Sequence, residues 1–243
     1  AVIVAMNFRS VWLLIAVSNL VMLFIIWKYL EEKNFSPDTS DHSLFTKTFR
    51  QTKKALSYMV GEKSGVLRGL LGAVVTGTVA FNAFFILAPL VFAHGLGMPP
   101  ENISALFSFV AIPLLVAPFV GEKVAHKVGF RRPLFLGFLG MGLAIVLFAI
   151  SKSLVLAIAS FFVFNFLETG FAKLSHTVVH HEIPSESRAS IGSLFHLLGS
   201  LGRMIASFAV GLGILYWGLV TTTILSGMLI LVTGILYMFC LKE

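Results

Sequence analysis

Seven long apolar stretches occupy most of this 243-residue chain. The hydrocarbon core of a bilayer is about 30 Å thick, so a helix that rises ~1.5 Å per residue needs about 20 apolar residues to cross it. Inside lipid the backbone must satisfy its hydrogen bonds within each segment, which favours helices. The sequence therefore predicts an all-α integral membrane protein with seven transmembrane helices. The expected spans are 11–30, 66–93, 102–121, 133–151, 153–175, 189–212 and 214–241.

The basic residues lie in alternate gaps between these spans. Fifteen of the eighteen Lys and Arg residues fall in one set of gaps, whereas the opposite set holds only Arg9 and Lys152. By the positive-inside rule the richer set faces the cytoplasm. We therefore expect the segment 31–65 and the C-terminus to be cytoplasmic, in a bacterial or archaeal cytoplasmic membrane. The net charge of +7 then reflects topology, and no nucleic-acid partner is expected.

One long polar segment, residues 31–65, divides the chain into unequal parts. Its first half is rich in turn residues, and its second half, Leu44–Val60, is basic and mildly amphipathic. We expect the second half to form a helix on the inner surface of the membrane. Residues 66–243 follow as six spans, while residues 1–30 hold one span. The apolar residues Ala1–Met6 suggest the tail of a further helix, so the chain is expected to be a piece of a longer protein.

The most specific motif is GEKVAHKVGFRR at Gly121–Arg132, between the second and third spans after the linker. It resembles the loop motif of the major facilitator superfamily, roughly G-x-L-A-D-R-x-G-R-R. Glu122, His126 and Phe130 depart from that pattern. Gly129 suits a tight turn between two helices. The candidate motif residues are Gly121, Lys127, Gly129, Arg131 and Arg132.

Two further segments carry the resemblance. Residues 7–12, NFRSVW, are similar to the sequence that leads into the sixth helix of these transporters. Residues 164–168 and 183–190 resemble the tenth helix and the following loop of the drug-exporter branch. The resemblance implies that residues 1–30 are the end of helix 5 and helix 6 of an N-terminal bundle, and that residues 66–243 are the C-terminal six-helix bundle. The missing N-terminal half is then an expected partner, alongside the lipid bilayer.

Polar residues inside the span 189–212 recur on one helical face, with spacings of 3, 4, 3 and 4. Arg203 alone costs roughly 3 kcal/mol at the bilayer centre, so this stripe must face protein or water. A cavity lining and a polar packing seam both remain open. The stripe consists of Ser193, His196, Ser200, Arg203 and Ser207.

Glu168 and Asn165 lie three residues apart on one face of the span 153–175. Counted from the cytoplasmic ends, Glu168 is about as deep as His196, and such a pair would suit proton coupling. Pairing of Glu168 with Lys173 is the plainer alternative. Thr76, Thr78 and Asn82 form a weaker patch on the span 66–93. The candidates for a substrate and proton pathway are Asn82, Asn165, Glu168, His196, Ser200 and Arg203.

Motifs for catalysis and metal binding are weak in this sequence. His176, His180 and His181 cluster near the end of one span, but no Cys or convincing carboxylate completes a ligand set, so no metal or cofactor is expected. No motif indicates an enzyme. The expected function is secondary active transport by alternating access, with proton-coupled efflux of a small molecule. A metabolite or sugar symporter, and a non-transporting scaffold or degenerate half-carrier, are the alternatives.

Overall fold

A computed structural model of the protein describes residues 17, 20–24, 28, 65–175, 177 and 188–240, which belong to two separate units. In the first unit the described residues are helical and exposed, and Lys28 Nζ lies 5.9 Å from the ring centroid of Phe24. Residues 31–64 with the expected surface helix, the 7–12 motif and the C-terminal residues 241–243 lie outside the described residues.

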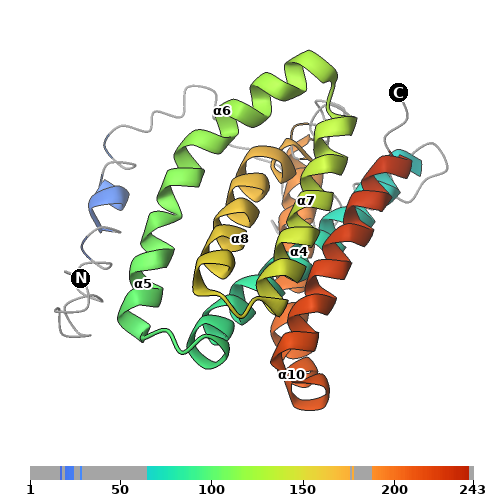
Figure 1. The fold of residues 1–243 in the computed structure, drawn as a ribbon. Helices are drawn as coiled ribbons and strands as arrows, with labels where there is room; N and C mark the ends of the chain where they lie inside the picture. The colour runs from blue at the N-terminus through green and yellow to red at the C-terminus, as the bar shows by residue number, and fades with distance from the viewer. Residues whose placement is uncertain are drawn as a thin grey trace, which may run out of the picture. The chain divides into compact units, whose positions relative to one another are not determined.

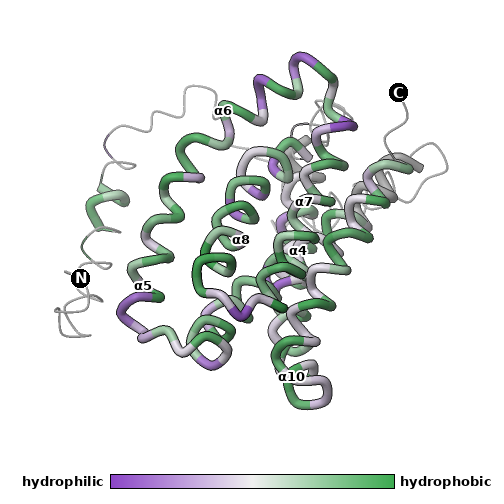
Figure 2. The backbone as a smooth tube through the Cα atoms, viewed as in Figure 1, coloured by the Kyte–Doolittle hydropathy of each residue, from purple (hydrophilic) through white to green (hydrophobic). Residues whose placement is uncertain are grey.

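The second unit is helical throughout its described elements (Figure 1). Among the described residues, five segments are long and apolar enough to cross a membrane, and hydrophobic residues run along them between polar turns (Figure 2). The chain is therefore an integral membrane protein by length and composition of its helices. The elements are α4 (Gly65–Leu90) with η2 (Val91–Gly95), α5 (Pro100–Phe109), α6 (Ala111–Val128), α7 (Arg131–Ile150), α8 (Leu154–Leu167) with η3 (Glu168–Ala172), and α10 (Arg188–Cys240).

The longest element, α10, contains two helices joined at Gly218. Gly218 has φ 78°, a left-handed conformation that glycine adopts without a steric penalty. The sequence placed this break at residue 213, which is wrong. Gly213 is helical and buried, and a Cβ there would lie 2.7 Å from Thr222 Cγ2. Gly213 thus lets the two arms of the hairpin approach, while Gly218 makes the turn.

The helix α6 runs seven residues beyond the predicted end of its span at residue 121. On this extension Glu122 Oε1 and His126 Nε2 lie 3.7 Å apart at i,i+4 spacing, so the two side chains are neighbours on one face of the helix. Only Gly129 and Phe130 separate α6 from α7. Gly129 has φ 80° and its N–H donates to the Ala125 carbonyl at 2.9 Å, so the expected turn glycine closes the helix.

The span 100–128 is interrupted at Val110, between α5 and α6. Pro113 explains the break, because its ring has no N–H to donate and would collide with the carbonyl four residues earlier, at Phe109. Pro118 also lies inside α6 but leaves the helix continuous. The two prolines therefore differ in effect.

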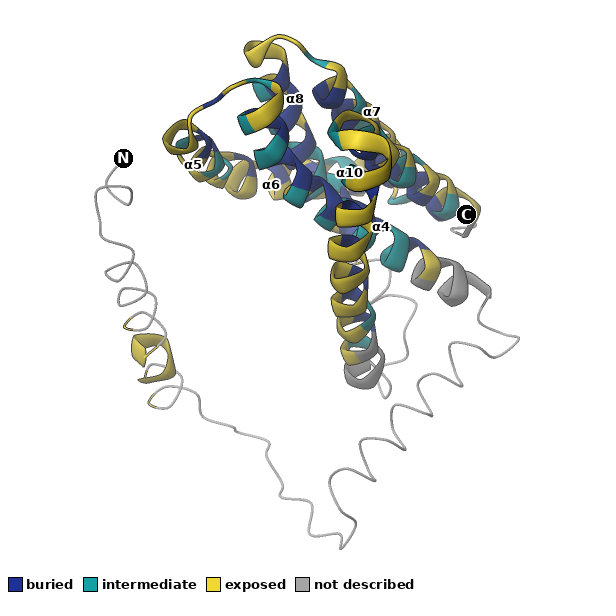
Figure 3. Ribbon diagram, turned by 90° about the horizontal axis from the view of Figure 1, so that it is seen from below, coloured by how far each residue is buried: buried dark blue, intermediate teal, exposed yellow. Residues whose placement is uncertain are grey.

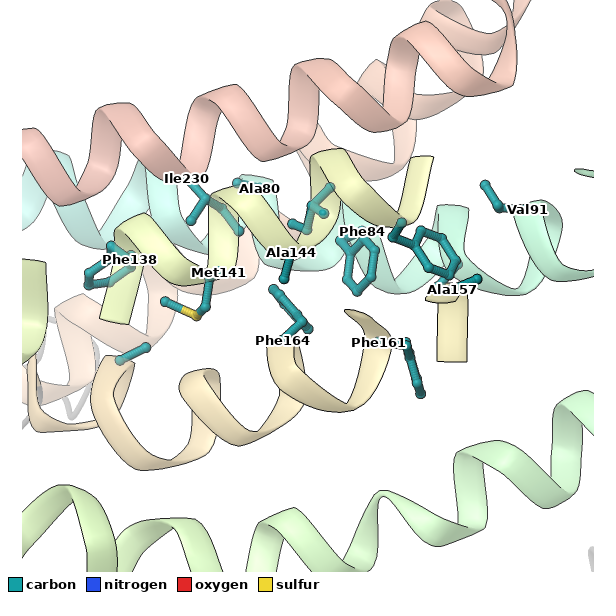
Figure 4. Close-up of a cluster of buried hydrophobic side chains, with 14 of the residues drawn as sticks. Ala80, Phe84, Val91, Phe138, Met141, Ala144, Ala157, Phe161, Phe164 and Ile230 are labelled. Carbon is teal, nitrogen blue, oxygen red and sulfur yellow. The ribbon is translucent and has the colours of Figure 1, made fainter. Parts of the chain in front are cut away.

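Phenylalanine rings from α4, α7 and α8 fill the centre of the second unit (Figure 4). Phe84 is fully buried, with ring centroids 5.3 Å from Phe148 and 4.3 Å from Phe164. The helix α10 packs along α4 and α7, and buried residues line the seams between helices while exposed residues cover the outside (Figure 3). In this packing α4, α10 and η3 surround a shared cavity.

Candidate functional site

A cavity of about 390 Å³ lies between α4, η3 and α10. It brings together four of the six predicted pathway residues, with Asn82 from α4, Glu168 from η3, and His196 and Arg203 from α10. Lys173, which follows η3, also lines it. Residues far apart in the sequence therefore line one cavity.

Arg203 is held by its own helix. Its Nη2 donates to Ser200 Oγ at 2.8 Å, and the Ser200 hydroxyl donates to the His196 carbonyl at 3.0 Å. Ser200 does not line the cavity, and its hydroxyl instead holds the Arg203 guanidinium in place. Ser193, His196, Ser200, Arg203 and Ser207 are all exposed on α10, which keeps the predicted stripe off the packed face of that helix.

Glu168 opens η3, where the α8 helix widens to a π-helix. Glu168 is partly buried, and the hydroxyl of Thr169 donates to its Oε2 at 3.1 Å. Within the described ranges, Glu168 forms no ion pair with Lys173, His196 or Arg203. π-Helical turns inside longer helices are frequent at functional sites, and this one presents the carboxylate to the cavity.

The two predicted asparagines have different surroundings. Asn82 lines the cavity, and its Nδ2 donates to the Thr78 carbonyl at 2.8 Å. Asn165 is buried and donates to the Phe161 carbonyl at 2.7 Å, and it is not among the residues that line the cavity. In this conformation Asn165 is a hydrogen-bonded core residue.

The weak threonine patch on α4 separates into two roles. Thr78 lines the cavity and lies against Gly202 of α10, where a Cβ would come within 3.3 Å of its side chain. Thr76 instead accepts a hydrogen bond from Thr233 at 3.1 Å and joins α4 to the second arm of α10. Small residues and hydroxyls thus set how closely α10 docks on α4, as is usual between helices in membranes.

The motif residue Gly121 lies within α6 and not in a loop. It is buried against η3, and a Cβ there would overlap the carbonyl oxygen of Gly170. Gly170 in turn leaves only 2.8 Å between a Cβ and the Ala117 carbonyl oxygen. The two glycines let α6 and η3 touch backbone to backbone, which positions the turn that carries Glu168. Lys127 lies in the last turn of α6, and Arg131 and Arg132 begin α7.

An aromatic wall completes the cavity, and sequence reasoning missed it. Each ring occupies an apolar span where core and lipid contact are equally good explanations, so no sequence signal marks these residues. Phe138 stacks on Tyr237 with centroids 5.1 Å apart and planes 19° apart. The wall is formed by Phe81, Phe85, Phe138, Phe195 and Tyr237.

No cluster of three or more His, Cys, Asp or Glu side chains suited to a metal occurs in the described part of the chain. The predicted histidine group, His176, His180 and His181, lies outside that part.

Comparison with known proteins identifies the class. The family model described as Major Facilitator Superfamily matches residues 1–207 and, in a second alignment, residues 69–243. The chain belongs to this superfamily. Its members are membrane transporters and not enzymes, so the chain is a membrane transport protein. No curated protein and no solved structure matches it.

Proposed function

We propose that the second unit is the C-terminal half of a secondary carrier that couples efflux of a small molecule to proton entry, with an N-terminal six-helix half as its partner. The cavity that joins Glu168, His196 and Arg203 carries this proposal. Charged residues at membrane depth are costly and tend to mark substrate or proton pathways. The resemblance of residues 164–168 and 183–190 to the drug-exporter branch favours efflux.

In the proposed cycle the substrate and the proton use the same cavity at different times. Glu168 takes a proton when the cavity is open to the outside and releases it when the cavity opens to the cytoplasm. Among the described residues, Lys173, His196, Arg203 and Tyr237 are the other titratable or charged groups that face this cavity, and those that line it from α4 are uncharged. Rocking of the two halves around a site near the midplane provides alternating access.

The test is proton coupling in the full-length carrier, reconstituted in liposomes with a pH-sensitive dye inside. Glu168→Gln keeps the shape of the side chain but removes its titration. The transported substrate is whichever of the probes 2-naphthoate, 2-naphthamide and 2-naphthylmethylammonium the carrier moves. We expect the proton flux that this probe drives to fall about tenfold or more, as for loss of an acid–base group. Counterflow of the same probe, which needs no net proton movement, is expected to remain.

Glu101→Gln is the matched control, because Glu101 is an exposed carboxylate in the first turn of α5 outside the cavity. It should transport like the wild type. Unchanged proton flux in both Glu168→Gln and His196→Ala between pH 5.5 and 8 would contradict proton coupling through this cavity.

The proposed orientation places the α6–α7 turn in the cytoplasm and the α7–α8 turn outside. In a Cys240→Ala background, a membrane-impermeant maleimide added to intact cells is expected to label Lys152→Cys, and to label Lys127→Cys only after permeabilisation. Lys127 is exposed in the last turn of α6 and Lys152 is exposed in the α7–α8 turn, so the labelling of each depends on the side of the membrane. Labelling of position 127 but not 152 in intact cells would reverse the orientation.

A further inference from the structure

We propose that the cavity takes an aromatic organic anion, a carboxylate carried on a flat apolar ring system. This inference rests on the proposed function and specifies its substrate class. It starts from the charged residues that line the cavity in the described part of the chain, which are the basic residues Lys173 and Arg203 and one carboxylate, Glu168. His196 adds a further donor. The described lining of the cavity therefore has more basic than acidic side chains, and an anionic ligand would balance this excess.

In the described part of the chain, no carboxylate competes with a ligand for these two basic side chains. Among the described residues, neither Lys173 nor Arg203 forms an ion pair with a carboxylate, Glu168 included. The hydrogen bond from Arg203 Nη2 to Ser200 Oγ, at 2.8 Å, occupies one of the five N–H donors of the guanidinium and fixes its direction. The remaining donors suit a carboxylate, which guanidinium groups bind through two parallel hydrogen bonds.

The aromatic wall specifies the rest of the ligand. Phe81 and Phe138 lie with centroids 6.2 Å apart, and Phe138 stacks on Tyr237, so neighbouring rings from α4, α7 and α10 form a continuous apolar surface. Aromatic rings favour offset or edge contacts with other rings. The volume of about 390 Å³ falls within the usual range for a small-molecule pocket and suits a ligand of one or two fused rings.

A cationic drug is the competing ligand, because aromatic faces also attract cations and the Glu168 carboxylate would balance a positive charge. The charge balance decides against it. A cationic ligand beside Glu168 would share the cavity with both Lys173 and Arg203, and like charges brought together cost several kcal/mol. An anion beside Arg203 faces one carboxylate, and the repulsion disappears whenever Glu168 is protonated.

The experiment compares three probes that share one ring system and differ in charge: 2-naphthoate, 2-naphthamide and 2-naphthylmethylammonium. Equilibrium dialysis against the full-length carrier in micelles at pH 7 measures each affinity. We expect naphthoate to bind about tenfold tighter than naphthamide, with the ammonium weakest. Arg203→Gln is expected to weaken naphthoate about tenfold and to leave naphthamide within about twofold.

Two further variants control for charge and fold. Lys152→Gln removes one positive charge in the α7–α8 turn, outside the cavity, and should leave naphthoate binding unchanged. Arg203→Lys keeps the charge but loses the two-pronged geometry, so its affinity should fall between wild type and Arg203→Gln. Naphthamide binding reports whether each variant retains a folded cavity.

Tighter binding of the ammonium, equal binding of all three probes, or naphthoate binding that survives Arg203→Gln would each overturn the anion assignment. The proton-flux test is independent of this ranking. If the carrier moves protons together with the ammonium probe, the proposed function stands and the assignment of an anionic substrate is wrong. If naphthoate binds as expected but Glu168→Gln and His196→Ala leave proton flux unchanged, the assignment of an anionic substrate stands and proton coupling through this cavity is wrong.

Discussion

Replacing Phe84 by alanine is expected to lower the free energy of unfolding by about 3 kcal/mol. Phe84 is fully buried and its ring packs on Phe148, Phe161 and Phe164. In a membrane the surroundings of an unfolded helix are also apolar, so burial in the protein gains little transfer free energy. Most of the expected loss of stability therefore comes from the cavity that the missing ring leaves, because the surrounding rings cannot move in to fill it.

Phe119→Ala is the matched control, because Phe119 is 75% exposed on the outer face of α6. It removes the same atoms and should change stability by less than about 0.5 kcal/mol. Unfolding in mixed micelles by increasing fractions of denaturing detergent, followed by circular dichroism, measures both variants. An equal loss in both would mean that the phenylalanine cluster does not hold the bundle together.

Within residues 65–240 the helical spans were predictable from hydropathy, because lipid leaves the backbone so few alternatives to helix. Their ends were less predictable, since a glycine can either make a turn or let two helices approach. Gly213 and Gly218 illustrate this, with Gly213 packed on Thr222 and Gly218 in the turn. Only the tertiary packing distinguishes the two. The extension of α6 to Val128 was missed because polar residues such as Glu122 end a hydrophobic run without ending the helix.

The polar part of the cavity was predictable and the apolar part was not. A residue such as Arg203 is expensive in lipid, so its presence in a span demands a protein or aqueous environment. A phenylalanine carries no free-energy penalty in lipid, in a protein core or in a cavity. The sequence therefore does not indicate which of these environments Phe81 and Phe195 occupy, and only the assembled helices show it. Asn165 shows the limit of the polar argument, because its own helix satisfies its side chain without any cavity.

The structure gives Gly121, the first residue of the Gly121–Arg132 motif, a packing role that the sequence alone did not indicate. The resemblance treats it as a loop, whereas Gly121 is a helical contact residue pressed against η3. Glu168 is the first residue of η3, two positions before Gly170. The α6–η3 contact therefore links the C-terminal half of α6 to the proposed proton site, and its disruption should affect both stability and coupling.

Gly121→Ala is accordingly expected to lower the free energy of unfolding by about 2 kcal/mol. The added Cβ would overlap the Gly170 carbonyl, which is backbone and cannot rotate away, so α6 and η3 must separate. Such overpacking costs about 3 kcal/mol, and the better helix propensity of alanine returns about 1 kcal/mol. The detergent-unfolding measurement used for Phe84 reports the change, and proton flux should fall with it because η3 carries Glu168.

Gly211→Ala separates the two contributions. Gly211 is also a helical glycine, in α10, but a Cβ there meets no atom within 4 Å. Only the propensity gain remains, so this variant should be unchanged or more stable by up to about 1 kcal/mol. If Gly121→Ala matched Gly211→Ala in stability and kept its proton flux, α6 and η3 would not be in backbone contact. The link from the motif to Glu168 would then have no physical basis.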